Sequence, residues 1–374
     1  MGMRRIVFMK LIVVSAILVT ALILLLSGCE GPGSVPSSPG PSTTSTITSS
    51  QQMTLGKSDS RILAAIRVQE KHTQRLMAQT DVVGTAVGLN DADEIVVKIY
   101  TAKEGVPNLP ATLDDMKVDV EVTGIIHAMT KGGPGGGGVS HTAKQTPPIQ
   151  LGTSGGRRDD FANGYCCGGT LGSLVQVNGV QYILSNYHVF EADVIPGTSN
   201  LVIQPGLIDV NCNAANAQNV ATLSGIKSLP GSNVDAAIAQ VTTGMVKTDG
   251  AILEIGTISA TTYNAFINET VKKSGRTTGL TRSRVSGLNA TVSVAYDNQC
   301  AGPTTFTKTF TGQILIANKG SKFLNSGDSG SLMVEDVTTN PRAVGLLFAG
   351  SSSVAVANPI GQVLSFFGAT MVGN

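Results

Sequence analysis

The sequence predicts an all-β protein preceded by a small α+β domain, and three observations support this fold class. Residues 148–374 consist of short candidate strands separated by Gly, Asn, Ser and Thr, with no long helical period. Residues 58–130 combine one helical pattern with three candidate strands. Residues 131–147 are rich in Gly and Pro and have no periodicity, so we expect a flexible linker between the two parts.

Residues 1–28 are predicted to be a signal peptide. Three basic residues precede an apolar run over residues 11–26, which is short for a membrane span. The run ends in Leu26-Ser27-Gly28-Cys29, which resembles the lipobox of bacterial lipoproteins, where the Cys becomes lipidated. This resemblance implies an exported protein, anchored to a bacterial membrane by a lipid on Cys29, in the outer membrane and periplasm or at the cell surface. Ordinary secretory cleavage and an uncleaved anchor are the alternatives.

Residues 29–57 are rich in Ser, Thr, Pro and Gly, and such a composition cannot bury enough apolar surface to fold. We expect them to form a disordered tether. In the following domain, at 58–130, Ser60 is the expected helix cap, and strands are expected at 82–87, 94–101 and 116–123. The position of this domain before the linker favours a prodomain, with an accessory domain as the alternative.

Charge and histidine content argue against several partners. The formal net charge is +1, with no long basic run, so neither nucleic acid nor an acidic membrane surface is an expected partner. Membrane contact is expected from the lipid alone. The four histidines do not form any metal-ligand spacing, so we expect no metal and no cofactor.

Four cysteines remain after the signal region, in a compartment that permits disulfides. Cys212 and Cys300 form the candidate disulfide. The adjacent Cys166 and Cys167 cannot readily bridge each other, and the connectivity of the four is left open.

One hairpin can be placed in detail. Asn178-Gly179 is a favoured two-residue turn, and it sets Val177 opposite Val180 and Val175 opposite Tyr182. The second strand of this hairpin leads directly into His188, so this histidine is expected at a strand exit.

Three short segments carry candidate catalytic residues beside predicted strands, in the order His188, Asp235, Ser329. A serine hydroxyl is a poor nucleophile at neutral pH, so it needs an imidazole to take its proton and a carboxylate to orient that imidazole. Asp193 and Asp209 are rival acids. Asp193 is too close to His188 in sequence to lie across a cleft from it, and Asp209 is not followed by an apolar strand.

Each of these residues also has a structural alternative: local hydrogen bonds for the histidine, a solvated turn for the aspartate and a chance loop for the serine. The motif Gly327-Asp328-Ser329-Gly330 is the most specific of the three signals. Its glycines permit a tight turn in which the backbone N–H groups of Gly327 and Ser329 can converge on an oxyanion.

Two segments resemble the trypsin-like (chymotrypsin-fold) serine proteases. Residues 166–190 resemble the strand pair that delivers the catalytic histidine, and residues 327–330 resemble the nucleophile turn. The resemblance covers about residues 150–370. It implies a double β-barrel protease domain over 148–374, which hydrolyses peptide bonds of protein or peptide substrates through a Ser-His-Asp triad and an acyl-enzyme intermediate.

The same resemblance implies further roles. Phe323 would form the floor of the primary specificity pocket, with Phe348 and Gly350 in its walls; a shift of one residue in the alignment would place Lys322 at the floor instead. An aromatic floor argues against selection of Lys or Arg. Cleavage in the linker could expose Ile149 as a new N-terminus whose amine pairs with Asp328, as in a zymogen.

The residues 272–281 also resemble a segment of bacterial trypsin-like proteases. We expect it to be a structural turn, with Lys272 and Lys273 as substrate contacts in the alternative.

Two other functions are consistent with the same residues. The domain could be a non-catalytic binding or scaffold module with an intact triad and a blocked cleft. It could also be a protease that processes only its own chain, near residues 131–160.

Overall fold

The computed structural model describes residues 55–129, 139–162, 164–192, 197–298, 300, 304–320 and 322–374, which belong to one compact unit. The predicted signal peptide, Cys29, nearly all of the tether, residues 131–138 of the linker and the rival acid Asp193 lie outside the described residues and stay predictions. Among the described residues, no helix combines the length and the apolar character needed to cross a membrane.

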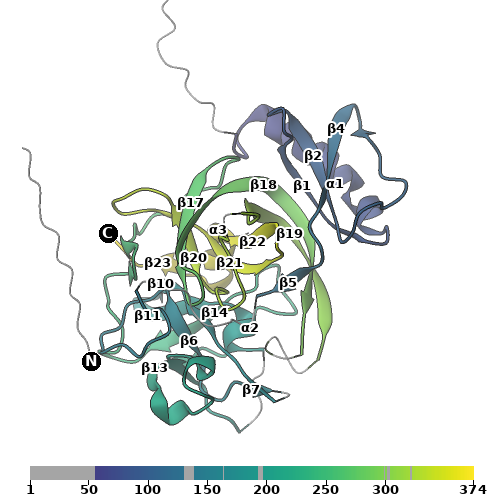
Figure 1. Ribbon diagram of the computed structural model, residues 1–374. Helices are drawn as coiled ribbons and strands as arrows, with labels where there is room; N and C mark the ends of the chain where they lie inside the picture. Colours follow the sequence, from purple (N-terminus) through teal and green to yellow (C-terminus); the bar gives the residue numbers. More distant parts are fainter. Residues whose placement is uncertain are drawn as a thin grey trace, which may run out of the picture. The chain divides into compact units, whose positions relative to one another are not determined.

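The first part of the domain at 148–374 is a β-barrel, here called the N-terminal barrel (Figure 1). Its sheet runs in the order β23, β10, β11, β14, β13, β12, β6, β9. The sheet closes on itself because β9 and β10 are consecutive parts of one extended segment, separated only by Gly172. The strands are Thr370–Met371, Ser173–Val177, Val180–Ser185, Ala237–Val241, Gln218–Leu223, Leu201–Gln204, Thr153–Arg157 and Gly169–Leu171 in that order.

The second part is also a closed barrel, here called the C-terminal barrel. Its strands pair in a ring, β17, β20, β21, β22, β19, β18 and back to β17. They span Thr270–Gly275, Leu332–Glu335, Ala343–Gly350, Val354–Pro359, Phe306–Ala317 and Gly279–Tyr296 in that order. The two closed sheets confirm the expected all-β double barrel.

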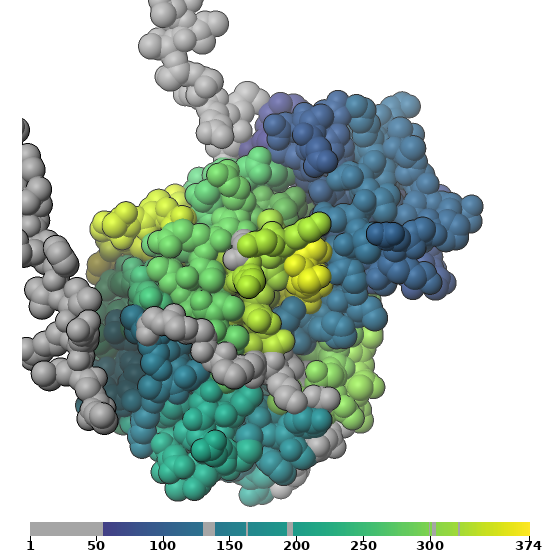
Figure 2. All heavy atoms as spheres, viewed as in Figure 1, coloured from purple at the N-terminus to yellow at the C-terminus, as the bar shows by residue number. Residues whose placement is uncertain are grey.

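The α+β segment supplies helix α1 (Ser60–Met77) and strands β1 (Val82–Leu89), β2 (Ile95–Thr101), β3 (Thr112–Leu113) and β4 (Met116–Val122). Asp59 caps α1, where Ser60 was expected, because its carboxylate accepts the N–H of Arg61. Strand β1 pairs antiparallel with β18, so the sheet of this segment continues that of the C-terminal barrel. Figure 2 shows these purple-to-blue residues packed against the green ones of the barrel.

Strand β5 (Ile126–Ala128) leaves the α+β segment and enters the C-terminal barrel sheet. It runs parallel to β18 and antiparallel to β21. Ile126 and Ala128 are buried there, whereas His127 between them is exposed. Residues that precede the protease-like domain in sequence therefore form part of its sheet.

The remaining short elements connect these strands. They are α2 (Tyr187–Phe190), α3 (Ile360–Phe367), the 3₁₀ turns η1 (Leu207–Asp209) and η2 (Ala214–Asn216), and the strand pairs β7 (Phe161–Ala162) with β8 (Tyr165–Cys166) and β15 (Ala251–Ile252) with β16 (Gly256–Thr257). The predicted hairpin is confirmed, with Val177 opposite Val180 and Val175 opposite Tyr182.

The predicted disulfide between Cys212 and Cys300 is wrong. The structure pairs Cys166 with Cys212 and Cys167 with Cys300. Neighbouring side chains of an extended segment point to opposite sides, so the two adjacent cysteines at the end of β8 meet partners from different parts of the chain. One bridge stays within the N-terminal barrel, and the other connects it to the loop after β18.

Candidate active site

Backbone register brings His188 to Asp235. Strand β11 ends at Ser185, opposite Ala237 in β14, and the chain continues from there into α2. Asp235 lies two residues before Ala237, and His188 lies three residues after Ser185. The antiparallel pairing therefore places both side chains beyond the same end of the sheet.

The two side chains are fully buried and directly bonded. The Nδ1 of His188 lies 2.6 Å from Oδ2 of Asp235, and the backbone N–H of His188 donates to Oδ1 at 3.3 Å. A carboxylate can only accept, so the imidazole carries its proton on Nδ1 and leaves Nε2 as an acceptor. Nε2 is buried and makes no hydrogen bond with the described residues. This arrangement suits a general base.

A further side chain, Tyr296, also contacts Asp235, and it was not predicted from the sequence. The hydroxyl of Tyr296, at the end of β18, donates to Oδ2 at 2.7 Å, and its ring meets the His188 ring edge-on. Burial, together with the nearby carboxylate, raises the pKa of Tyr296 well above its usual value, so the phenol keeps its proton. No sequence signal marks this tyrosine, because 61 residues separate it from Asp235.

Ser329 lies in a tight turn, and two glycines of its motif adopt the conformation predicted for them. Gly327 and Gly330 have φ of 93° and 92°, which side chains rarely tolerate. Gly169 fits between this turn and the helix of His188, since a Cβ there would lie 3.0 Å from the carbonyl oxygen of Ser329 and 2.7 Å from Cγ2 of Val189. The turn and α2 thus meet where the barrels join.

The hydroxyl of Ser329 is not bonded to His188 in this structure. Its Oγ donates instead to the carbonyl oxygen of Phe348, in β21, at 3.2 Å. Of the three predicted triad residues, the structure therefore bonds His188 to Asp235 and directs the Ser329 hydroxyl to Phe348.

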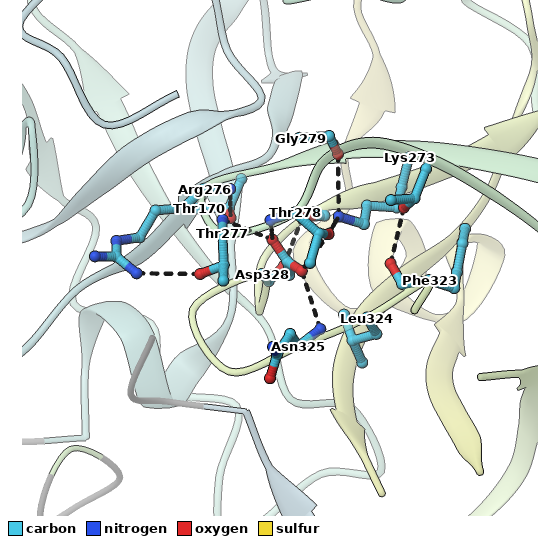
Figure 3. A network of polar contacts seen from close by, with 12 residues as sticks. Thr170, Lys273, Arg276, Thr277, Thr278, Gly279, Phe323, Leu324, Asn325 and Asp328 are labelled. Carbon is cyan, nitrogen blue, oxygen red and sulfur yellow. Dashed lines mark hydrogen bonds and ion pairs between the residues drawn. The ribbon is translucent and has the colours of Figure 1, made fainter. Parts of the chain in front are cut away.

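The aspartate of the turn, Asp328, anchors the turn to the loop after β17 (Figure 3). Its Oδ1 accepts the N–H groups of Thr277 and Thr278 at 2.8 and 3.1 Å. Its Oδ2 accepts the Thr278 hydroxyl at 2.7 Å and the N–H of Asn325 at 3.0 Å. The ammonium of Lys273 lies 3.2 Å from Oδ2, and both of these side chains are fully buried. The turn around Ser329 is thus fixed from outside the cleft.

This network bears on two expectations. Lys273 is not a surface substrate contact, because it is buried with Asp328. Burial lowers its pKa, an effect that the carboxylate opposes. The expected pairing of an Ile149 amine with Asp328 requires cleavage of the chain before Ile149, so the uncleaved chain does not test it and it stays a prediction. In this structure Ile149 is buried and its N–H donates to the carbonyl oxygen of Met245. The cation beside Asp328 is the ammonium of Lys273.

The rival acid Asp209 serves another function. It forms an ion pair with Arg276 at 2.6 Å and accepts the hydroxyl of Ser154 at 2.5 Å. It therefore braces the N-terminal barrel against the loop after β17 and does not orient His188.

The three residues predicted for the specificity pocket differ in what they contribute. Gly350 lies beside the side chain of Met129, whose Cε would be 3.1 Å from a Cβ at position 350. Phe348 turns its ring into the core against Phe310, with centroids 4.9 Å apart, and presents only its carbonyl to the cleft. Phe323 is fully buried in a core cluster that also contains Met129.

The chain itself occupies the cleft, through Met129 at the end of the α+β segment. The N–H of Gly327 donates to the carbonyl oxygen of Met129 at 2.9 Å, and the N–H of Met129 donates to the carbonyl oxygen of Phe348 at 3.2 Å. Of the two N–H groups predicted for the oxyanion hole, that of Gly327 already meets a peptide carbonyl. The described residues contain no group of His, Cys, Asp and Glu side chains placed to hold a metal ion.

Comparisons with known proteins give the following relationships. A family model of the Nal1 C-terminal domain matches residues 231–358. No curated protein sequence matches. Among solved structures, a glutamic acid-specific serine protease is 19% identical over 60% of this chain and 100% of its own, with a TM-score of 0.41. Thermobifida fusca Protease A is 21% identical over 60% and 99% of the two chains, with a TM-score of 0.40. Cellulomonas bogoriensis chymotrypsin is 20% identical over 55% and 91%, with a TM-score of 0.35.

At this level of similarity the fold assignment depends on the two closed barrels and on what lies between them. A His–Asp pair at a strand exit of one barrel and a Gly-Asp-Ser-Gly turn in the other define a trypsin-like serine protease fold.

Proposed function

We propose that this protein is a serine endopeptidase that hydrolyses peptide bonds through Ser329, His188 and Asp235. The observation that carries the proposal is the buried His188–Asp235 hydrogen bond of 2.6 Å, with the free Nε2 of the imidazole at the join between the barrels. An imidazole held in this tautomer has no evident structural use for its second nitrogen, whereas a general base requires it.

The proposed reaction proceeds in two halves. The Oγ of Ser329 attacks a peptide carbonyl, and His188 accepts the hydroxyl proton and passes it to the leaving amine. The N–H of Gly327 stabilises the developing oxyanion. Water, deprotonated by His188, then releases the acyl group and restores the serine.

The test is hydrolysis of quenched-fluorescent casein by the purified full chain. Wild type should hydrolyse it, and Ser329→Ala and His188→Ala should each lose at least about 1,000-fold, as removal of a triad member does elsewhere. Thermal unfolding of the variants provides the control for folding. Equal activity of wild type and Ser329→Ala would refute the proposal.

A non-catalytic binding module is the second candidate function, and one observation favours it. The Oγ of Ser329 donates to Phe348 and not to His188, so a permanently occupied cleft would hold the serine inactive. A fluorophosphonate probe separates the two, since only an activated hydroxyl reacts covalently. Labelling that disappears in Ser329→Ala excludes the binding module.

Export and anchoring by a lipid on Cys29 are part of the proposal, supported by the sequence pattern alone. Growth with an alkyne analogue of palmitate should label the wild-type chain in the membrane fraction, and Cys29→Ala should abolish the label. A label that persists in this variant would contradict the anchor.

A further inference from the structure

Residues 126–129 occupy the cleft in the manner of a substrate segment. Strand β5 pairs antiparallel with β21, with Ala128 opposite Ala349 and His127 opposite Gly350. The pairing continues by the hydrogen bond from the Met129 N–H to the carbonyl oxygen of Phe348. An extended peptide that adds a strand to a sheet edge is a general mode of peptide recognition, since the backbone supplies affinity and alternate side chains supply specificity.

The segment ends with a carbonyl that accepts a hydrogen bond predicted for the oxyanion hole. The Met129 carbonyl oxygen accepts the N–H of Gly327 at 2.9 Å, in the same turn that carries Ser329. The oxygen that becomes negative during attack on a peptide bond is the one that needs such a donor. The bond next to this carbonyl joins Met129 to Thr130.

The side chain of Met129 lies in a built pocket. It is 91% buried (9% exposed) and packs in one cluster with Leu324, and its sulfur lies 3.7 Å from the hydroxyl of Ser326. Gly350 leaves room for its terminal methyl, which a Cβ at that position would approach to 3.1 Å. Lys322 lines the adjoining cavity of about 890 Å³, so a second cation would be repelled there.

We infer that this enzyme's own chain is a substrate, cut between Met129 and Thr130, and that the cleft selects an uncharged apolar side chain of the size of methionine before the cut bond. The inference rests on the proposed endopeptidase function and adds its specificity and its first target. The buried positions of Ile126 and Ala128 further favour an apolar residue three positions earlier and a small one immediately before the methionine.

The step is balanced with water as the only co-reactant. The Oγ of Ser329 forms a bond to the carbonyl carbon of Met129, the bond to the Thr130 nitrogen breaks, and the hydroxyl proton reaches that amine through His188. Water then cleaves the ester, so that the serine hydroxyl returns and a carboxylate forms on Met129. The new C-terminal segment then competes with other substrates for β21 as a product inhibitor.

The first experiment follows the intact mass and the N-terminal sequences of the purified full chain. Wild type should separate into two pieces, the second beginning at Thr130, and Ser329→Ala should stay in one piece. Met129→Leu should be cut within about fivefold of the wild-type rate, whereas Met129→Lys should be slowed at least 100-fold. Val120→Lys is the matched control, because it places the same charge on an exposed position of β4, and it should be cut at the wild-type rate.

A second experiment does not depend on processing of the chain. The peptides acetyl-Ile-His-Ala-Met and acetyl-Ile-His-Ala-Lys, with free carboxylates, are added to the casein assay. The methionine peptide should inhibit at least 30-fold more strongly than the lysine peptide.

The possible results separate this inference from the proposed function. Casein hydrolysis without a cut after Met129, a cut at another bond, or equal inhibition by the two peptides would overturn the inference and leave the endopeptidase intact. No hydrolysis of casein, of peptides or of the chain itself would overturn the proposed function and the inference with it. Cleavage after Met129 that persists in Ser329→Ala would assign the cut to another protease and also refute the inference.

Discussion

Removal of one hydroxyl tests whether Tyr296 positions the catalytic pair. In Tyr296→Phe the hydrogen bond of 2.7 Å to Oδ2 of Asp235 is lost, while the ring that packs against His188 stays. A hydrogen bond to a charged group contributes about 1.5–3 kcal/mol. In the proposed mechanism Asp235 stabilises the imidazolium that forms during attack, so we expect kcat to fall about 10- to 100-fold, at about 1.4 kcal/mol for each factor of ten, with KM within about twofold.

The assay is steady-state hydrolysis of a quenched-fluorescent peptide that contains Ile-His-Ala-Met. Tyr100→Phe is the matched control, since Tyr100 is equally buried but its hydroxyl has no hydrogen-bond partner among the described residues. It should keep the wild-type kcat. If Tyr296→Phe matches this control in kcat, Tyr296 is a core residue only, and the reasoning about the carboxylate is refuted.

Two further predictions concern buried charges. Lys273→Met leaves Asp328 without its cation, so we expect the free energy of unfolding, measured by urea denaturation, to fall by about 3–5 kcal/mol. Lys103→Met, at an exposed position, is the control. A loss below about 1 kcal/mol, no larger than that of the control, would show that the ion pair does not hold the turn. Burial raises the pKa of Glu269 to about 7, so the folded state retains this proton longer than the unfolded state and stability falls as the pH rises from about 4.5 to 7. The free energy of unfolding of Glu269→Gln should therefore exceed that of wild type by on the order of 2 kcal/mol at pH 8, after allowance for partial solvent access, and should equal it at pH 4. A difference that does not change with pH would contradict the assignment.

The sequence predicted those features that local patterns encode. The Asn178-Gly179 turn fixed a hairpin, and the hairpin in turn placed His188 at a strand exit, because strand register propagates from a turn. The glycines of the Ser329 motif predicted a tight turn, and the structure has positive φ at Gly327 and Gly330.

Features that depend on distant pairings could not be predicted in this way. Tyr296 meets Asp235 across 61 residues, and Lys273 meets Asp328 in the core although its neighbours in sequence indicate a surface turn. The cysteine partners were equally undetermined, since four cysteines allow three connectivities. Strand β5 gave no signal, because its three residues join a sheet whose other strands lie far away in the chain.

The pairing of β1 with β18 has a consequence for where the processed enzyme would reside. A cut after Met129 divides the covalent chain, yet the ladder from Gly84 opposite Val292 to Gly88 opposite Gly287 still joins the pieces. With the proposed lipid on Cys29, the N-terminal fragment would carry the anchor, and the two fragments would travel as a noncovalent heterodimer. Retention at the bilayer would depend on backbone hydrogen bonds between two polypeptides, and mild denaturant would release the hydrolase from its anchor without breaking any covalent bond.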